Sequence, residues 1–211
     1  MKTDDLIDLL AKDVPPAERP GWRRRMAITL LAGLVIAAIL VVLFFGMRPD
    51  IGTSLTAVLL KAGFSAAAAA AVLPLAARLM RPGRPLGWRI AAIAIFLGVC
   101  ALAVLIALMG APPERRFEAW MGGRFPWCIV FVPLLAAPTA AGLLWLMRAF
   151  APTRLTLSGA AIGAVAGGIG AMAYAMYCPV DSVAFVTTWY SVAIGLCAAL
   201  GALIGSKLLR W

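Results

Sequence analysis

The stretch MAITLLAGLVIAAILVVLFFG, residues 26–46, contains no charged side chain over 21 residues. At a rise of 1.5 Å per residue, a helix of about 20 residues is about 30 Å long, which is the thickness of the hydrocarbon core of a bilayer. The stretch therefore predicts a membrane-spanning helix. Its length, and the lack of an A-x-A cleavage site after it, argue against a cleaved signal peptide.

The rest of the chain repeats this composition. Of its 211 residues, 64% are hydrophobic and 13% are charged, a much smaller charged share than in soluble domains. Apolar stretches of about 20 residues or more occupy 26–46, 54–77, 89–110, 125–148, 157–177 and 185–206. Short connections between them require neighbouring helices to run antiparallel. We therefore predict an all-α, polytopic membrane protein with six transmembrane helices in three hairpins.

Lysine and arginine are distributed unevenly between the two sides of this predicted bundle. Of the 19 basic residues, fourteen fall in the N-terminal tail, the second and fourth connections and the C-terminus. Four fall on the opposite side: Arg48, Arg115, Arg116 and Arg124. Because cytoplasmic loops are enriched in Lys and Arg, both termini are predicted to be cytoplasmic. The same bias explains the net charge of +10, so we predict no direct binding of nucleic acid.

The N-terminal sequence MKTDDLIDLLAKD predicts a short cytoplasmic amphipathic helix. Thr3 can cap this helix, and Asp4 and Asp5 then lie in its first turn, where the helix dipole favours negative charge. An apolar stripe follows at helical spacing, formed by Leu6, Ile7, Leu9, Leu10 and Val14. The helix either lies on the membrane surface or docks into a groove of a protein partner. Its carboxylates suit a basic protein better than an anionic lipid surface.

Two domains follow from this division: residues 1–25 form a cytoplasmic tail, and residues 26–211 form a transmembrane domain. The nine acidic residues all lie outside the deep parts of the predicted spans, and the chain has no histidine. Coupled transporters usually carry carboxylates near the membrane midplane, and histidine is the commonest general base near neutral pH. We therefore predict a protein that is not an enzyme and has no cofactor.

Lys61 is the one charged residue that lies deep inside a predicted span. It is interpreted either as a functional intramembrane charge or as a side chain that snorkels to the outer interface. Small residues also recur in the spans, with glycine every fourth position at Gly159, Gly163 and Gly167 and again at Gly201 and Gly205. This spacing indicates close helix packing, either within one bundle or across the face of a homodimer.

The four cysteines fall into two classes. Cys100 and Cys197 lie near the middle of spans and are interpreted as small apolar residues. Cys128 begins the fourth span and Cys178 ends the fifth, so both are predicted at the extracytoplasmic face beside the interface. From the residues alone, this pair is either structural, as a disulfide or as inert thiols, or it responds to oxidants or transiently binds soft metal ions.

The stretch YCPVDSVAFVTTWYS, residues 177–191, surrounds Cys178 with further unusual residues. Pro179 is expected to end the helix. Trp189 and Tyr190 are expected to open the next helix as interfacial anchors. With MKTDDLIDLLAKD, with RFPWCIVFVPLLAAPTAAGLLW at residues 124–145, and with six spans, this stretch makes the chain resemble the NrsF-type family of anti-sigma factors.

That resemblance implies a six-span inner-membrane protein of proteobacteria. Such proteins hold an extracytoplasmic-function sigma factor and release it under heavy-metal or oxidative stress. It implies sigma-factor binding by Asp4 and Asp5 and the apolar stripe that follows them, and stress sensing by Cys128 and Cys178. The supporting motif, to which no role is assigned, comprises Trp127, Pro179, Asp181, Trp189 and Tyr190.

We therefore expect a bacterial inner-membrane anti-sigma factor whose partners are the sigma factor, the lipid bilayer and, in one interpretation, a second copy of the chain. Two alternatives remain. A membrane thiol–quinone oxidoreductase would normally need a C-x-x-C pair, which this sequence lacks. A small transporter or assembly factor has Lys61 as its one supporting residue.

Overall fold

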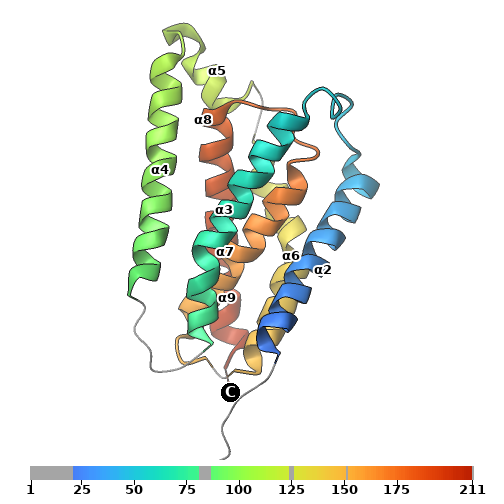
Figure 1. Ribbon diagram of the computed structural model, residues 1–211, viewed down its shortest axis with the longest axis vertical. Coiled ribbons are helices and arrows are strands. Elements are labelled where there is room, and N and C mark those ends of the chain that lie inside the picture. Colours follow the sequence, from blue (N-terminus) through green and yellow to red (C-terminus); the bar gives the residue numbers. More distant parts are fainter. Residues whose placement is uncertain (1–20, 81–86, 124–125, 151, 211) are drawn as a thin grey trace, which may run out of the picture.

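The computed structural model describes the chain except for residues 1–20, 81–86, 124–125, 151 and 211 (Figure 1). The described part is helical and contains no strand. Six helical segments are long and apolar enough to cross a membrane: Trp22–Phe45, Leu55–Leu79, Trp88–Gly110, Cys128–Arg148, Leu155–Tyr174 and Val183–Leu208. The prediction of an all-α protein with six membrane-length helices is thus confirmed, whereas the expected amphipathic helix lies outside the described residues.

Two of the six spans are composite. The first is α2 (Trp22–Leu40) continued by the π-helical turn η1 (Val41–Phe45). The last consists of α8 (Val183–Phe185), the π-helical turn η3 (Val186–Tyr190) and α9 (Ser191–Leu208). The other four are α3 (Leu55–Leu79), α4 (Trp88–Gly110), α6 (Cys128–Arg148) and α7 (Leu155–Tyr174), and a short helix, α5 (Arg116–Met121), follows the 3₁₀ turn η2 (Pro113–Arg115).

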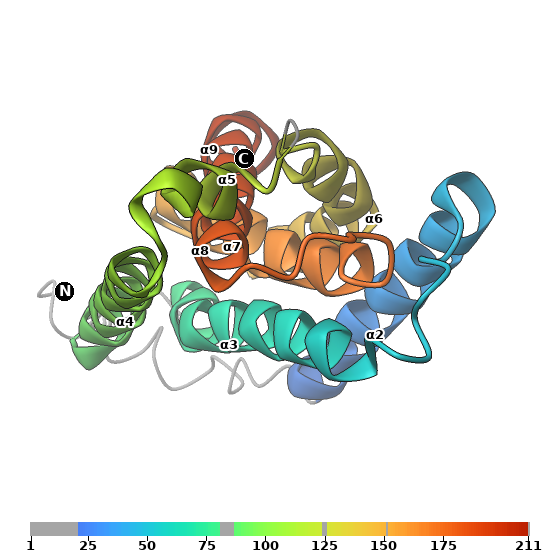
Figure 2. The same cartoon turned by 90° about the horizontal axis from the view of Figure 1, so that it is seen from above.

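Helix α7 lies at the centre of the bundle, packed against α2, α3, α6 and α9 (Figure 2). Its small residues permit this position, because a larger side chain would meet a neighbouring helix. A Cβ atom at Gly168 would lie 2.8 Å from the Cβ of Ala69 on α3, and one at Gly163 would overlap the Cys197 carbonyl on α9. The glycine repeat therefore serves packing inside one chain, as small residues do between membrane helices.

Consecutive spans do not pack as the three expected hairpins. Helices α7 and α9 form an extensive contact, but α2 packs mainly on α6 and α7, and α4 packs on α3 and on the α8–η3 segment. The three-hairpin arrangement is therefore not confirmed. The physical reason is that helix partners depend on the shape of the helix surfaces: α2 packs on α6 and on the small residues of α7, whereas α4 packs on α3 and on the α8–η3 segment.

The antiparallel course of the helices divides the charged residues between two ends. One end, here termed the basic end, holds the start of α2 with Arg23, Arg24 and Arg25, the ends of α3 and α6, and the C-terminus (Figure 1). The opposite end, termed the cysteine end, holds α5, the linker 46–54 and the linker 175–182 that contains Cys178. This separation agrees with the asymmetry of basic residues in the sequence; which end faces the cytoplasm stays a prediction.

Candidate functional site

Cys178 lies at the cysteine end, four residues beyond the end of α7. Its backbone N–H donates a hydrogen bond of 3.1 Å to the carbonyl of Tyr174, which closes the last turn of the helix. Pro179 follows, and a proline cannot supply the N–H that a continuing helix needs. The predicted helix end is thus placed three residues too late, because the chain leaves α7 at Tyr174 and reaches the proline through a turn.

Cys128 is the first residue of α6 and belongs to the same buried cluster as Cys178. Their exposed fractions are 0% and 2%, and all four cysteines of the chain are free thiols. The expectation that the Cys178 thiol sits outside the bundle is therefore wrong, although the residue does lie at the end of the bundle as expected. The linker wraps over the end of the bundle, so the thiol is covered by side chains from other segments.

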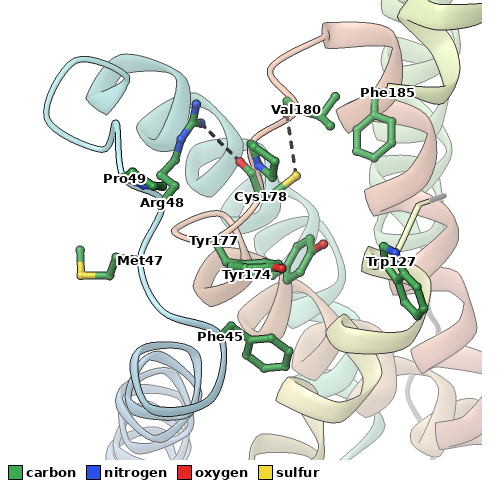
Figure 3. A pocket seen from close by; sticks show the side chains of 11 residues that line it. Phe45, Met47, Arg48, Pro49, Trp127, Tyr174, Tyr177, Cys178, Val180 and Phe185 are labelled. Carbon is green, nitrogen blue, oxygen red and sulfur yellow. Dashed lines mark hydrogen bonds between the residues drawn. The ribbon is translucent and has the colours of Figure 1, made fainter. Parts of the chain in front are cut away.

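Aromatic rings belong to the same buried cluster as the two cysteines. Phe131 on α6 is central: its ring centroid lies 4.6 Å from that of Phe45, 5.7 Å from that of Trp127 and 6.2 Å from that of Tyr174. Edge-to-face and offset contacts at these distances are the favourable geometries for aromatic pairs. Figure 3 shows Phe45, Trp127 and Tyr174 arranged around the Cys178 segment. The supporting-motif residue Trp127 thus takes part in a ring cluster that joins η1, α6 and α7.

Trp189 and Tyr190 have different roles from those expected. Tyr190 is fully buried, with its ring centroid 6.0 Å from that of Tyr174, so it is a core residue. Trp189 is partly buried and donates from Nε1 to the carbonyl of Trp120 at 2.9 Å, which fastens α5 onto η3. The prediction that both open the last helix as interfacial anchors is wrong, because that helix begins earlier, at Val183.

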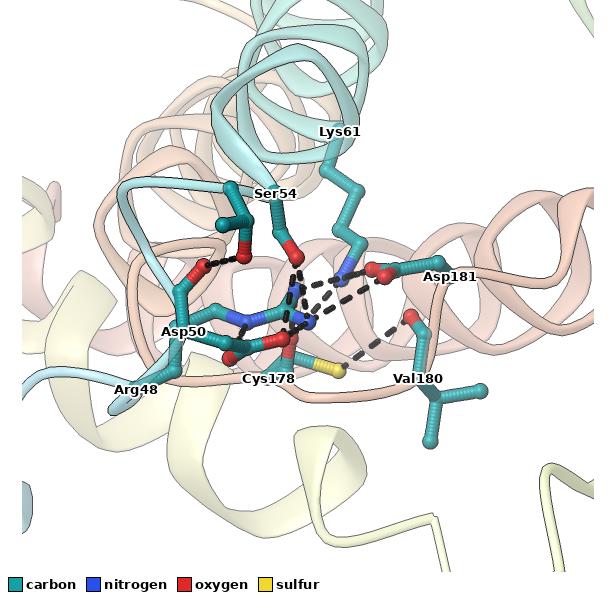
Figure 4. Close-up of polar contacts among 8 residues, drawn as sticks. Arg48, Asp50, Ser54, Lys61, Cys178, Val180 and Asp181 are labelled. Carbon is teal, nitrogen blue, oxygen red and sulfur yellow. Dashed lines mark hydrogen bonds and ion pairs between the residues drawn. The ribbon is translucent and has the colours of Figure 1, made fainter.

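A network of charged groups holds the Cys178 linker from the other side (Figure 4). Lys61 Nζ lies 2.6 Å from Asp181 Oδ1 and donates to the Cys178 carbonyl at 2.7 Å. Arg48 donates from Nη1 to Asp181 at 2.9 Å and to the same Cys178 carbonyl at 3.3 Å, and from Nε to Asp50 at 2.7 Å. We term these five residues the ion-pair network.

The electrostatics of this network follow from unequal burial of its members. The side chains of Arg48 and Lys61 are only 4% and 3% exposed, whereas Asp181 is 39% exposed. A buried charge is tolerated when it is paired and hydrogen-bonded. The hydrogen bond from Arg48 lowers the pKa of Asp181, and Lys61 adds to this effect. The same guanidinium, joined by Ser54, lowers the pKa of Asp50, and the two carboxylates in turn raise the pKa of Arg48.

Lys61 is therefore neither lipid-facing nor unpaired. Its side chain is buried within the bundle, and its ammonium group ends at Asp181 and Cys178, both in the linker at the cysteine end. Sequence reasoning also missed Arg48 and Asp50 as members of this network. One signal was present: an Arg, a Lys and two Asp all fall near the same predicted outer ends of the spans, where charges in a tight linker tend to pair.

A cavity of about 360 Å³ lies between the ring cluster and the Cys178 linker. Its walls come from four segments, namely the end of η1 with linker 46–54, the start of α6, the end of α7 with linker 175–182, and α8. The residues that matter for its chemistry are Phe45, Met47, Trp127, Tyr177, Cys178 and Phe185. The cavity is predominantly apolar, and it carries one thiol.

Similarity to known proteins extends over the whole chain. Residues 10–211 match the family described as NrsF, negative regulator of sigma F. The chain belongs to the NrsF family. It is 34% identical over 214 residues to the probable anti-sigma-F factor NrsF of Azospira oryzae, and 34% identical over 217 residues to the anti-sigma-F factor NrsF of Caulobacter vibrioides. Both similarities cover 100% of each chain, and no solved structure matches.

NrsF-family proteins are regulators, so this chain is not an enzyme. The alternative of a thiol–quinone oxidoreductase is thereby overturned. The transporter alternative loses its one support as well, because the two partners of Lys61 give that residue a structural role. The predicted sigma-binding residues of this NrsF-family chain, Asp4, Asp5, Leu6, Ile7, Leu9 and Leu10, lie outside the described residues.

The metal-binding capacity of this NrsF-family chain rests on two sulfur atoms. Cys128 and Cys178 are soft ligands, but a stable tetrahedral site for zinc usually needs four ligands. In the part of the chain that the structure describes, no group of three His, Cys, Asp or Glu residues is placed to hold a metal ion. A transient interaction with a soft cation through the two thiols is the most that these residues offer.

Proposed function

We propose that this chain is an anti-sigma factor of the bacterial inner membrane that captures an extracytoplasmic-function sigma factor with its N-terminal tail. In this proposal, reaction of Cys128 and Cys178 with heavy metals or oxidants outside the cytoplasm releases the sigma factor. The observation that carries the proposal is full-length similarity to two proteins named anti-sigma-F factors. The length of the match includes both the tail and the membrane domain, so it supports one regulatory unit.

The position of the tail supports its role in capture. Helix α2 begins at Trp22, so residues 1–21 lead directly into a membrane-length helix at the basic end. The tail carries Asp4, Asp5 and a stripe of apolar residues at helical spacing. Acidic groups beside an apolar stripe favour docking into a groove of a basic protein.

The connection between the thiols and the tail supports the release step. The Cys178 carbonyl is held by Lys61 from α3 and by Arg48, which follows η1 at the far end of the first span. That span runs through the bundle to Trp22, at the C-terminal end of the tail. Modification of the Cys178 sulfur would displace its own carbonyl and both cations with it. Coupling between distant sites requires an element with two arrangements, and the π-helical turn Val41–Phe45 is our candidate, since such turns are frequent at functional sites.

Capture by the tail is tested by co-purification from detergent-solubilised membranes, with bound proteins identified by mass spectrometry. We expect a sigma factor with the wild type and none with the Asp4→Ala/Asp5→Ala variant. The matched control is Glu114→Ala/Glu118→Ala, which also removes two negative charges, but from the opposite end of the molecule. This variant should retain the sigma factor. Absence of a sigma factor from the wild-type preparation would contradict the proposed function.

Sensing by the thiols is tested with a transcriptional reporter of the sigma factor in cells exposed to cadmium or hydrogen peroxide. We expect Cys128→Ser and Cys178→Ser to abolish or strongly reduce induction. The matched control is Cys100→Ser/Cys197→Ser, because these two thiols are also buried but lie within α4 and α9. Normal induction in the Cys128 and Cys178 variants would show that the stress signal is received elsewhere.

A further inference from the structure

We propose that the cavity beside Cys178 binds a small, uncharged, planar electrophile of the quinone class, which adds covalently to the Cys178 thiol. Binding and addition involve this cavity alone. The further role of the addition, as the signal that releases the sigma factor, rests on the proposed function. The proposal follows from four properties of the cavity: its size and walls, its charge, the position of its mouth, and the groups around the thiol.

The size and walls of the cavity suit one flat ring system. Ligand-binding pockets generally measure about 300–1,000 Å³, and this cavity, at about 360 Å³, is near the lower limit. Its walls carry five aromatic side chains, those of Phe45, Trp127, Tyr174, Tyr177 and Phe185. Aromatic rings prefer offset stacking and edge-to-face contacts with other rings. An electron-poor ring such as a quinone is well matched to the electron-rich faces of tryptophan and tyrosine.

The charge of the cavity disfavours anionic ligands. Of the described residues that line it, Arg48 alone carries a formal charge. Every nitrogen of that guanidinium already donates to the protein, Nε to Asp50, Nη1 to Asp181 and Cys178, and Nη2 to Asp50, Asp181 and Ser54. An anionic ligand would therefore find no free cation to pair with it. Burial of an unpaired charge costs several kcal/mol or more, so the cavity disfavours an anionic ligand.

The exposed part of the cavity wall, here termed its mouth, includes apolar side chains. Met47 and Trp127, which line it, are 50% and 51% exposed, and the neighbouring Phe44 is 76% exposed. Figure 3 shows Met47 and Trp127 on opposite sides of the Cys178 segment. Exposed apolar side chains at the end of a membrane-length helix face the boundary between lipid and water. A molecule that enters here comes from the membrane, which favours a lipophilic ligand.

The groups around the thiol suit an addition reaction. The hydroxyl of Tyr190 is buried without a hydrogen-bond partner, in the same cluster as Cys178. The Cys178 Sγ makes one weak hydrogen bond, of 3.9 Å to the Val180 carbonyl. A buried polar group without a strong partner is costly in a protein interior. The thiol that lines the cavity is therefore not committed to a strong partner in the protein and keeps its sulfur lone pairs available to a ligand.

The reaction balances without any further oxidant or reductant. The sulfur electron pair forms a C–S bond with a ring carbon of the quinone, and the electrons of the adjacent C=C bond move to the conjugated carbonyl oxygen. The thiol proton ends on that oxygen. The hydrogen of the substituted ring carbon then moves as a proton to the second oxygen, so the product is a thioether-substituted hydroquinone attached to Cys178.

The test uses the full-length protein in lipid nanodiscs and two probes, 1,4-naphthoquinone and its anionic 2-sulfonate. Adducts are counted by intact mass and located by peptide mass spectrometry, and each rate is divided by the rate of that probe with glutathione. We expect a single adduct, on Cys178, formed at least about tenfold faster by the uncharged probe, which corresponds to about 1.4 kcal/mol of discrimination. Equal normalised rates for the two probes would overturn the proposal.

Variants separate the cavity from the thiol. Cys178→Ser should remove the adduct, whereas Cys197→Ser, which loses a buried thiol that does not line the cavity, should leave the rate unchanged. Val180→Trp should fill the cavity and slow the uncharged probe while the thiol remains. Labelling of Cys100 or Cys197 at the same rate as Cys178 would overturn the proposal without reference to any variant.

The same preparations distinguish this proposal from the proposed function. An intact sigma-factor complex that forms no Cys178 adduct overturns the cavity proposal and leaves the anti-sigma function standing. An adduct on Cys178 in a protein that never retains a sigma factor would support the cavity proposal and contradict the proposed function.

Discussion

Helix α7 and the linker that follows it are adjacent in sequence and both are buried, but they are held in different ways. The middle of α7 is held by shape, since glycines at 159 and 163 bring its backbone against that of α9. The linker 175–182 is held by charge, through Lys61, Arg48 and Asp181. A close-packed contact has one arrangement, whereas an ion-pair network can exchange partners. Helix α7 is therefore expected to be the rigid part of this region, and the linker that contains Cys178 the adjustable part.

The largest effect is expected from Gly163→Leu. The new side chain would overlap the α9 backbone at Cys197, and backbone cannot move aside without separating the helices. We expect a loss of about 3 kcal/mol or more in the free energy of unfolding, measured by thermal unfolding in detergent and by yield. The control is Gly98→Leu in α4, where a Cβ would meet nothing within 4 Å. Similar melting temperatures for both variants would contradict packing by shape in α7.

A smaller loss of unfolding free energy is expected from Lys61→Met, which removes one cation from the ion-pair network. Breaking a fully buried ion pair costs about 3–5 kcal/mol. Here we expect about 1–3 kcal/mol in unfolding free energy, because Asp181 is 39% exposed and keeps Arg48 as a partner. A double-mutant cycle with Asp181→Asn checks the mechanism: the double variant should lose less than the sum of the single losses. Strict additivity would show that the two side chains are not coupled.

Acidification should weaken the linker and leave the α7–α9 contact unchanged. The pKa values of Asp181 and Asp50 are lowered in the folded protein. Their contribution to stability is therefore complete above the ordinary carboxyl pKa of about 3.9 and is lost as the pH falls through the lowered values. As the pH drops below about 4, we expect the melting temperature of the wild type to decrease. The decrease should be less steep in Asp181→Asn. An equal pH dependence in this variant would assign the acid sensitivity to other carboxylates.

The smallest effect is expected from Asp50→Asn. Asp50 is 52% exposed, so water competes for Arg48 and screens the pair. Arg48 would also keep Asp181 and the Cys178 carbonyl. The melting temperature of Asp50→Asn should therefore fall by less than that of Asp181→Asn under the same conditions. A larger fall would show that Asp50, and not Asp181, is the principal partner of Arg48.

The sequence was sufficient for properties that depend on local composition. The six spans, their approximate limits and the grouping of basic residues at one end were all predicted, because transfer of a helix into lipid depends on its own side chains. The choice of helix partners was not predictable in this way. Helix α2 packs on α6 and α7 because of the shape of their surfaces, for example where Gly142 on α6 meets Thr29, and a hydropathy pattern carries no information on shape.

The same distinction, between what local composition predicts and what helix packing decides, applies to the candidate site. By itself, the sequence determined that Cys128 and Cys178 lie at one end of the bundle, that Lys61 is an unusual charge within a span, and that the chain resembles the NrsF family. Only the tertiary structure decided that both thiols are buried, that Tyr190 is a core residue, and that Arg48 and Lys61 meet at the Cys178 carbonyl. These contacts join residues more than a hundred positions apart, and they exist because the folded bundle encloses charges that must then be paired.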